Sequence, residues 1–366
     1  MRFRSRLAIP GSVLALLFAM PHIASAQEIK TRTMSFESFD GVDLQGTFYI
    51  SKNGGGSPSV ILLHSPFKDP VKGDWDGLAK TLAGEGYNVV RFDFRGHGKS
   101  VDLKDKAKFW QEPINAKYMP TQAMKNNKTI SYKDFETKSG YFPMLTNDIL
   151  AARIELDKYN DAGDANSSTV YIIGATDATT LGMLYLGVEW GRPSEILVNV
   201  NLPPKYVPWP RNDWQKIDEV GVDIAGCIWL SGHRHASVPA VTMKNISANN
   251  PRLRELNQML FLHGELDKAP NPDQAYGKFF VNDVLNATAA PPNPKKLDPL
   301  KYTQLRDVPK SKNIGVDLLG NGLGTEKLII DFLATIEKLR KSPGKKPMRY
   351  YGKPPPIYFP GLGLTL

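Results

Sequence analysis

A short run of hydroxyl and carboxyl side chains follows a long apolar stretch near the middle of the chain. Residues 169–174 are Thr-Val-Tyr-Ile-Ile-Gly, and residues 175–178 are Ala-Thr-Asp-Ala, after which a helix-like pattern begins. A strand, a sharp turn and a helix in this order can expose a nucleophile, in the pattern Gly-x-Ser-x-Gly. Thr176 stands at the serine position, so the chemistry to test in this Thr176 turn (residues 174–178) is acyl transfer by a hydroxyl.

The elements that would position this turn are predicted from apolar patterning. Runs of alternating polarity at 33–39 and 44–51 flank Asp40-Gly41 and predict a hairpin. Buried strands are predicted at 60–63, 88–94, 196–200, 223–230, 259–263 and 314–319, and helices at 74–83, 144–158 and 324–340. Strand, helix and strand at this spacing imply a parallel sheet, so we expect an α/β fold with a mostly parallel central sheet and helices on both faces.

One segment interrupts this alternation. Residues 101–143 are polar and rich in lysine, with three prolines and scattered aromatic side chains. We interpret them as an insertion after the fourth strand, either a surface insertion or a lid. Residues 341–366 form a basic tail rich in proline and glycine, which we expect to be extended.

Four motifs occur in the order and at the spacing of a known family. They are Leu62-Leu63-His64, the stretch Phe-Asp-Phe-Arg-Gly-His-Gly-Lys-Ser at 92–100, the Thr176 turn, and Leu-His-Gly-Glu-Leu-Asp at 262–267. Together they resemble the α/β-hydrolase fold superfamily, in its dienelactone-hydrolase and serine-aminopeptidase-like branches. The resemblance covers nearly all of residues 33–340 and implies one α/β-hydrolase-like domain over residues 27–340.

The resemblance implies a triad of nucleophile, acid and histidine in that chain order. Thr176 stands at the nucleophile position and Asp267 at the acid position. The histidine motif expected after the eighth strand is replaced by residues 320–324, Gly-Asn-Gly-Leu-Gly, with Leu323 at the histidine position, and no histidine follows His263. The triad is therefore degenerate, and we expect Thr176 to cap the following helix through its hydroxyl rather than to act as a nucleophile.

Two further histidines could substitute for the missing base. His233 and His235 flank Arg234 directly after the sixth predicted strand, where loops face the crevice of an α/β sheet. Either would have to reach hydrogen-bond distance of the nucleophile; the alternative is a pair of exposed loop residues. Two histidines without a third ligand motif do not predict a metal site, and the sequence indicates no cofactor.

The residues expected around an oxyanion are also altered. His64-Ser65-Pro66-Phe67 replaces the usual glycine-rich turn, and Pro66 supplies no N–H. The second donor would be the N–H of Asp177, whose own carboxylate would oppose a nearby negative charge. Ser65, Pro66 and Asp177 therefore predict a weakened oxyanion site.

The first 26 residues have the pattern of a secretory signal peptide. Three arginines (Arg2, Arg4 and Arg6) precede a short apolar stretch that contains two prolines and ends in Ala24-Ser25-Ala26. We expect cleavage rather than a transmembrane helix, hence a secreted or periplasmic protein in which the single cysteine, Cys227, is buried. The net charge of +9 falls to +6 without those arginines, a modest surplus that does not favour nucleic-acid binding.

These observations favour an exported α/β-hydrolase-fold protein that binds a small-molecule ligand without cleaving it. The alternative is an active ester or lactone hydrolase with Thr176 as nucleophile and a recruited histidine. A third interpretation makes the tail at 341–366 a segment that binds the cell envelope or a partner. The sequence does not indicate the ligand or the oligomeric state.

Overall fold

Eight strands form one sheet in the computed structural model, which describes residues 28–68, 72–119, 126–191, 220–250, 253–254, 257–267, 277–285, 303–340 and 356–359. The strands are β1 (Thr31–Glu37), β2 (Asp43–Tyr49), β3 (Pro58–Leu63), β4 (Asn88–Phe92), β5 (Asn166–Ala175), β6 (Ile224–Leu230), β7 (Gln258–Gly264) and β8 (Gln304–Val308). Their order in the sheet is β1-β2-β4-β3-β5-β6-β7-β8.

A hairpin starts the sheet, and the remaining strands are parallel. β1 pairs with β2 in antiparallel register, with Glu37 opposite Asp43, and β2 pairs with β4 in the same sense. The turn between β1 and β2 contains Gly41, whose φ of 89° lies in the region that favours glycine. From β4 through β3 to β8 every pairing is parallel. The predicted hairpin and parallel sheet are both confirmed.

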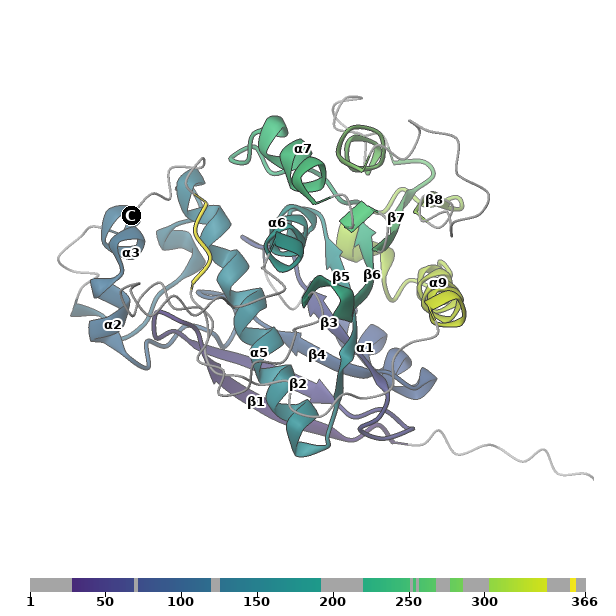
Figure 1. Cartoon of the computed structure of the whole chain (residues 1–366), viewed down its shortest axis with the longest axis horizontal. Helices are drawn as coiled ribbons and strands as arrows, with labels where there is room; N and C mark the ends of the chain where they lie inside the picture. Colours follow the sequence, from purple (N-terminus) through teal and green to yellow (C-terminus); the bar gives the residue numbers. More distant parts are fainter. Residues whose placement is uncertain are drawn as a thin grey trace, which may run out of the picture.

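Helices cover both faces of the sheet (Figure 1). They are α1 (Trp75–Glu85), α5 (Thr146–Ala162), α6 (Ala178–Gly191), α7 (Ala240–Asn249) and α9 (Thr325–Arg340). One hydrophobic cluster contains Ile61 and Leu63 of β3 with α5, α6 and α7, and the other contains Val60 and Leu62 with α1 and α9. Alternate side chains of one strand thus enter opposite cores, which explains the continuous apolar runs of these strands. Cys227 belongs to the first of these two clusters as a free, buried thiol, as expected.

The eighth strand is not where the sequence predicts it. Residues 314–319 are apolar except for Asp317, but Gly315–Leu318 form a 3₁₀ helix, η8, after a residue with extended backbone. The strand at this edge is β8, whose sequence Gln-Leu-Arg-Asp-Val is largely polar and partly exposed. An edge strand is paired on one side only and tolerates charged residues, so its apolar signal is weak. The strand predicted at 196–200 lies outside the described residues.

The segment at 101–143 contains short helices: α2 (Lys106–Gln111), α3 (Pro113–Tyr118), η1 (Tyr132–Asp134) and the start of η2 (Ser139–Leu145). The fully buried side chain of Arg95 connects this segment to the rest of the domain by hydrogen bonds. Arg95 donates to Asp40 (2.6 Å), to Asp148 of α5 (2.7 Å) and to the Tyr141 hydroxyl (3.2 Å). Asn115 of α3 donates to the same Asp40 at 2.8 Å. Hairpin, segment and α5 therefore share one buried polar network.

The strand order, the helices on both faces and the strand–turn–helix at β5 confirm the α/β class and the α/β-hydrolase fold that the sequence motifs imply. Within the described residues, no helix combines the length and the apolar character needed to cross a bilayer. Residues 1–26 and most of the tail at 341–366 lie outside the described part, so the signal peptide stays a prediction.

Candidate functional site

The Thr176 turn has the strained backbone of a nucleophile-bearing turn. Thr176 follows β5 directly and has a φ of 51°, a left-handed conformation that is rare for a β-branched residue. The surrounding backbone holds it there, because its N–H donates to the Leu230 carbonyl (2.9 Å) and its carbonyl accepts from the N–H of Thr179 (3.1 Å). The fold has therefore kept the geometry of the turn although the residue type is unfavourable for it.

The hydroxyl of Thr176 is bound to a neighbouring hydroxyl. Its partner is the side chain of Ser65, on the turn after β3, and both residues are 3% exposed. Ser65 also donates toward the Ala175 carbonyl (3.3 Å), which leaves Thr176 as the donor to Ser65. In the described part of the chain the Thr176 hydroxyl has no other partner. The expected cap of α6 by this hydroxyl is therefore not formed.

His233, the first candidate base, forms an ion pair with Asp177 of the turn. Its Nε2 lies 2.7 Å from the Asp177 carboxylate, and its Nδ1 lies 3.3 Å from the Ser231 carbonyl. Burial opposes the charged imidazolium, but the hydrogen bond and charge of Asp177 outweigh it and raise the pKa of His233. In the charged form that Asp177 favours, both ring nitrogens donate, and no lone pair remains to accept a proton from Thr176.

His235, the second candidate, is held by other groups. Its Nδ1 accepts from the Ser237 N–H (3.2 Å) and lies 2.6 Å from the Ser237 hydroxyl, while its ring stacks on Phe142 with centroids 3.8 Å apart. Burial lowers its pKa, so the ring is neutral. Thr180 of α6 ties this loop to the turn, since its hydroxyl donates to the His233 carbonyl (3.0 Å) and accepts the His235 N–H (2.8 Å).

The other histidines of the domain have structural partners. Nε2 of His64 accepts the Phe94 N–H (3.0 Å), and Nε2 of His97 accepts the Phe67 N–H (2.8 Å). Burial lowers the pKa of His64 well below its usual value and that of His97 to about 4, so both rings are neutral. His263 pairs with Asp307 at 2.9 Å. Among the described residues, therefore, no imidazole bonds to the Thr176 hydroxyl.

The assignment of Asp267 as the acid stays a prediction. Asp267 follows β7 in the turn where the family resemblance places it, with its N–H bonded to the Gly264 carbonyl at 3.0 Å. Within the described residues, groups of at least three histidine, cysteine, aspartate or glutamate side chains able to hold a metal ion are absent.

Gly315, which the sequence did not single out, begins η8 and lies against Thr176. A Cβ on Gly315 would stand 2.5 Å from Cγ2 of Thr176, and its N–H donates to the Ser231 hydroxyl (2.8 Å). Leu323 instead packs beside the core under α1 and α9. The assignment of Leu323 to the histidine position relied on the misplaced eighth strand and stays a prediction. The signal available in the sequence was the glycine itself inside this apolar stretch, and its φ of 57° in the structure lies in the region that favours glycine.

The turn after β3 offers few N–H donors for an oxyanion. Pro66 is buried and has none, and the N–H of Phe67 is already bonded to His97. Phe67 itself has a φ of 61°, so this turn is strained like the Thr176 turn. The Asp177 carboxylate of the Thr176 turn is paired with His233.

Aromatic rings from the 101–143 segment cover this side of the sheet. Phe67 packs against Phe135 and Phe142 with centroids 6.1 and 5.9 Å apart, and Tyr132 stacks on His97 at 4.6 Å. Together with the Phe142–His235 stack, these contacts join the segment to both loops that flank the Thr176 turn. The segment is therefore packed against the candidate site through rigid aromatic side chains.

No family model matches the chain. A curated AB hydrolase superfamily protein from Gibberella zeae is 41% identical over 56 residues, a match that spans 15% of this chain and 19% of that relative. Solved structures similar to the chain include an esterase from Pyrococcus furiosus (14% identity, 84% of this chain, 91% of that chain, TM-score 0.45). A dienelactone hydrolase from Anabaena variabilis is also similar (14% identity, 85% of this chain, 98% of that chain, TM-score 0.43).

Proposed function

We propose that this chain is an exported α/β-hydrolase-fold protein that binds a small molecule beside the Thr176 turn and does not hydrolyse it. The observation that carries the proposal is the pairing of the groups that a triad would use. The Thr176 hydroxyl is bound to Ser65, and His233 is bound to Asp177 and Ser231. Neither pair can pass a proton from nucleophile to base without first being broken.

The expected cost to catalysis is large. Loss of the histidine of a serine triad lowers turnover by roughly 10⁶-fold, and the residual rate depends on the oxyanion site and on binding. Here Pro66 and the bonded N–H of Phe67 weaken that site as well. A hydrolase built on these residues would therefore keep little of the usual rate enhancement.

An activity screen of the mature protein, from residue 27, tests the absence of catalysis. p-Nitrophenyl esters, lactones and a fluorophosphonate probe are offered to the wild type and to Thr176→Ala and Ser65→Ala. We expect all three proteins to give the rate of buffer alone and no labelled adduct. Turnover that is lost in Thr176→Ala but kept in Ser65→Ala would overturn the proposal.

Binding is tested at the exposed apolar residues near the turn. Ile314 is 42% exposed and directly precedes Gly315, so a ligand with an apolar group would contact it. Esters, lactones and carboxylic acids are screened by thermal shift, since a ligand that binds only the folded protein raises Tm. We expect Ile314→Asp to abolish a shift that the wild type shows, and Val241→Asp, at a 62% exposed residue of α7, to leave it unchanged.

The alternative function is an active ester or lactone hydrolase. Retention of a left-handed φ at Thr176 favours it, because backbone strain of this kind gathers at functional sites. In that case Thr176→Ser should raise the rate, since serine removes the methyl group that contacts Gly315, and His233→Ala should abolish it. Export is tested separately: mass spectrometry of the protein made with residues 1–26 should find a chain that begins at Gln27.

A further inference from the structure

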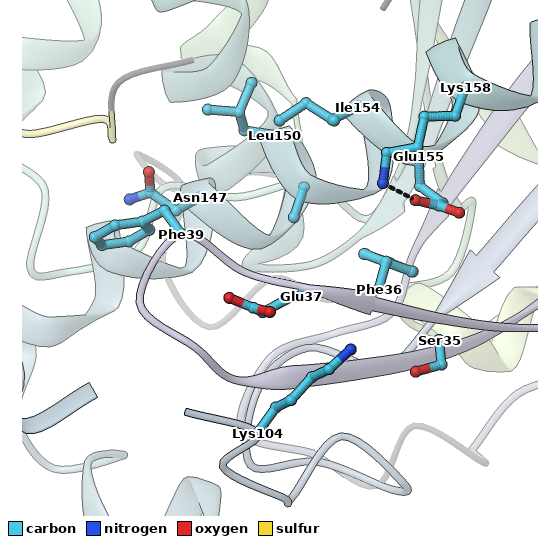
Figure 2. Close-up of a pocket in the computed structure, with 11 residues that line it drawn as sticks. Ser35, Phe36, Glu37, Phe39, Lys104, Asn147, Leu150, Ile154, Glu155 and Lys158 are labelled. Carbon is cyan, nitrogen blue, oxygen red and sulfur yellow. Dashed lines mark hydrogen bonds and ion pairs between the residues drawn. The ribbon is translucent and has the colours of Figure 1, made fainter. Parts of the chain in front are cut away.

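A hollow of about 250 Å³ lies beside the outer edge of β1, against α5 (Figure 2). Its apolar wall is formed by Phe36 of β1, Phe39 of the hairpin turn, and Leu150, Ala151 and Ile154 of α5. None of the residues that form the Thr176 turn lines it. The hollow is therefore a separate site, and what it binds does not depend on the proposed function.

Charged side chains surround the hollow unequally. Glu155 pairs with Lys158 at 2.7 Å, and Glu37 pairs with Lys108 at 3.0 Å, so both acids of the lining have a cationic partner. Lys104 is exposed, and the described part of the chain contains no acid within ion-pair distance of its ammonium group. Figure 2 shows the Lys104 side chain directed at the hollow from the side opposite α5. The unbalanced charge at the hollow is thus positive.

At one end of the hollow, two lining residues, Asn147 and Phe39, contact the tail. The Asn147 side-chain amide accepts the Ile357 N–H at 2.7 Å and donates to the Ile357 carbonyl at 3.0 Å. It thus bonds to both backbone groups of one residue, as the backbone of a paired strand does. The ring of Tyr358 meets Phe39 edge to face, with centroids 6.4 Å apart. Because Asn147 is satisfied by the tail, the polar side chain at this end does not need a partner from a ligand.

We propose that the hollow binds a linear monocarboxylate of medium chain length, with its carboxylate at Lys104 and its chain along the wall of β1 and α5. A volume of 250 Å³ equals that of roughly eight waters, enough for a chain of about eight carbons. A single exposed ammonium contributes little by itself, so the apolar chain supplies most of the affinity. Each added CH₂ should tighten Kd about threefold to fourfold until the hollow is full.

Isothermal titration calorimetry of the full mature chain tests this, with octanoate, octanol and octylamine as probes. Octanoate should bind most tightly and octylammonium most weakly, because only the head group differs. Lys104→Gln should weaken octanoate about threefold to tenfold and leave octanol unchanged. The control is Lys133→Gln, at an exposed lysine of η1 that does not line the hollow, and it should behave as the wild type.

Three results would overturn the proposal. Octanoate and octanol could bind equally, octanoate could bind equally well to Lys104→Gln, or no probe could bind. Ala151→Leu, which fills the wall, gives a second readout and should weaken octanoate and octanol alike. Octanoate affinity that falls in Ile314→Asp but not in Lys104→Gln would place the ligand at the Thr176 turn instead, which contradicts this proposal and supports the proposed function.

Discussion

The loop directly after β4 carries Arg95, and the turn after β5 carries Thr176. The two motifs hold these side chains in different ways. After β4, Arg95 is completely buried and bonded to two carboxylates and a hydroxyl. After β5, Thr176 keeps the backbone of a catalytic turn, but its hydroxyl is bonded to Ser65. Arg95 is therefore fixed through several side-chain bonds, whereas Thr176 is fixed through its backbone and one bond to Ser65.

This difference shows which parts of a catalytic fold its stability requires. Removal of one partner from a buried ion pair leaves an uncompensated charge, which is strongly destabilising, so Arg95 and its carboxylates cannot vary one at a time. The side chains around Thr176 are held instead in single pairs, Thr176 with Ser65 and His233 with Asp177.

The largest effect is expected from breaking the Arg95 network. Arg95→Met leaves Asp40 and Asp148 buried without their cation and should lower the free energy of unfolding by about 3–5 kcal/mol. Urea denaturation measures it. The matched control is Arg32→Met, which breaks an exposed ion pair with Asp164 and should cost less than about 1 kcal/mol. Equal losses in the two variants would contradict the load assigned to Arg95.

The second effect concerns the packing under the Thr176 turn. Gly182 of α6 faces the Trp229 indole so closely that a Cβ would stand 2.2 Å from a ring carbon. Trp229 is buried within β6 and cannot swing away, so Gly182→Ala should destabilise the fold by about 1–3 kcal/mol. Gly84→Ala in α1 meets no atom within 4 Å and should instead stabilise by about 0.4–1 kcal/mol. Opposite signs in thermal melts would show that the turn is maintained by close packing.

Much of the fold was predictable because its signals are local. Val60 to Leu63 form an apolar run because both faces of β3 are buried, and Asp40-Gly41 marks a hairpin because its backbone needs a positive φ. β8 was missed because an edge strand can be polar. The apolar residues at 314–319 pack from a 3₁₀ helix instead, which hydrophobicity alone cannot distinguish from a strand.

The candidate site was only partly predictable, because partners distant in sequence decide it. The sequence indicated Thr176, Ser65, Asp177 and His233 as residues of one region. It could not show that they pair as two separate couples, Thr176 with Ser65 and His233 with Asp177, since pairing depends on where the β3 and β6 loops meet the turn. Gly315 was missed for the same reason, because its contact with Thr176 can be inferred only once the position of β8 is known.

The pairing of Thr176 with Ser65 should be visible as a moderate energetic coupling. A double-mutant cycle with Thr176→Val and Ser65→Ala removes each hydroxyl alone and then both. We expect a coupling of about 0.5–1.5 kcal/mol, as for one buried hydrogen bond between hydroxyls. Thr179→Val serves as the control partner, because its hydroxyl lies in the next turn of chain and has no partner among the described residues. Additive effects of Thr176→Val and Ser65→Ala would show that the hydroxyl of Thr176 is available for chemistry.

The smallest effect is expected from the His233–Asp177 pair, and it depends on pH. Asp177 raises the pKa of His233 above its ordinary value of 6.5, so the pair stabilises the folded state fully below that value. The contribution disappears as the pH rises through the pKa of the folded protein. Asp177→Asn should therefore cost more stability at pH 6 than at pH 9, and NMR titration should show the His233 pKa lowered. If the pKa of His233 were unchanged in Asp177→Asn, His233 would not be held by Asp177. It could then serve as a base for Thr176, which would contradict the proposed binding function.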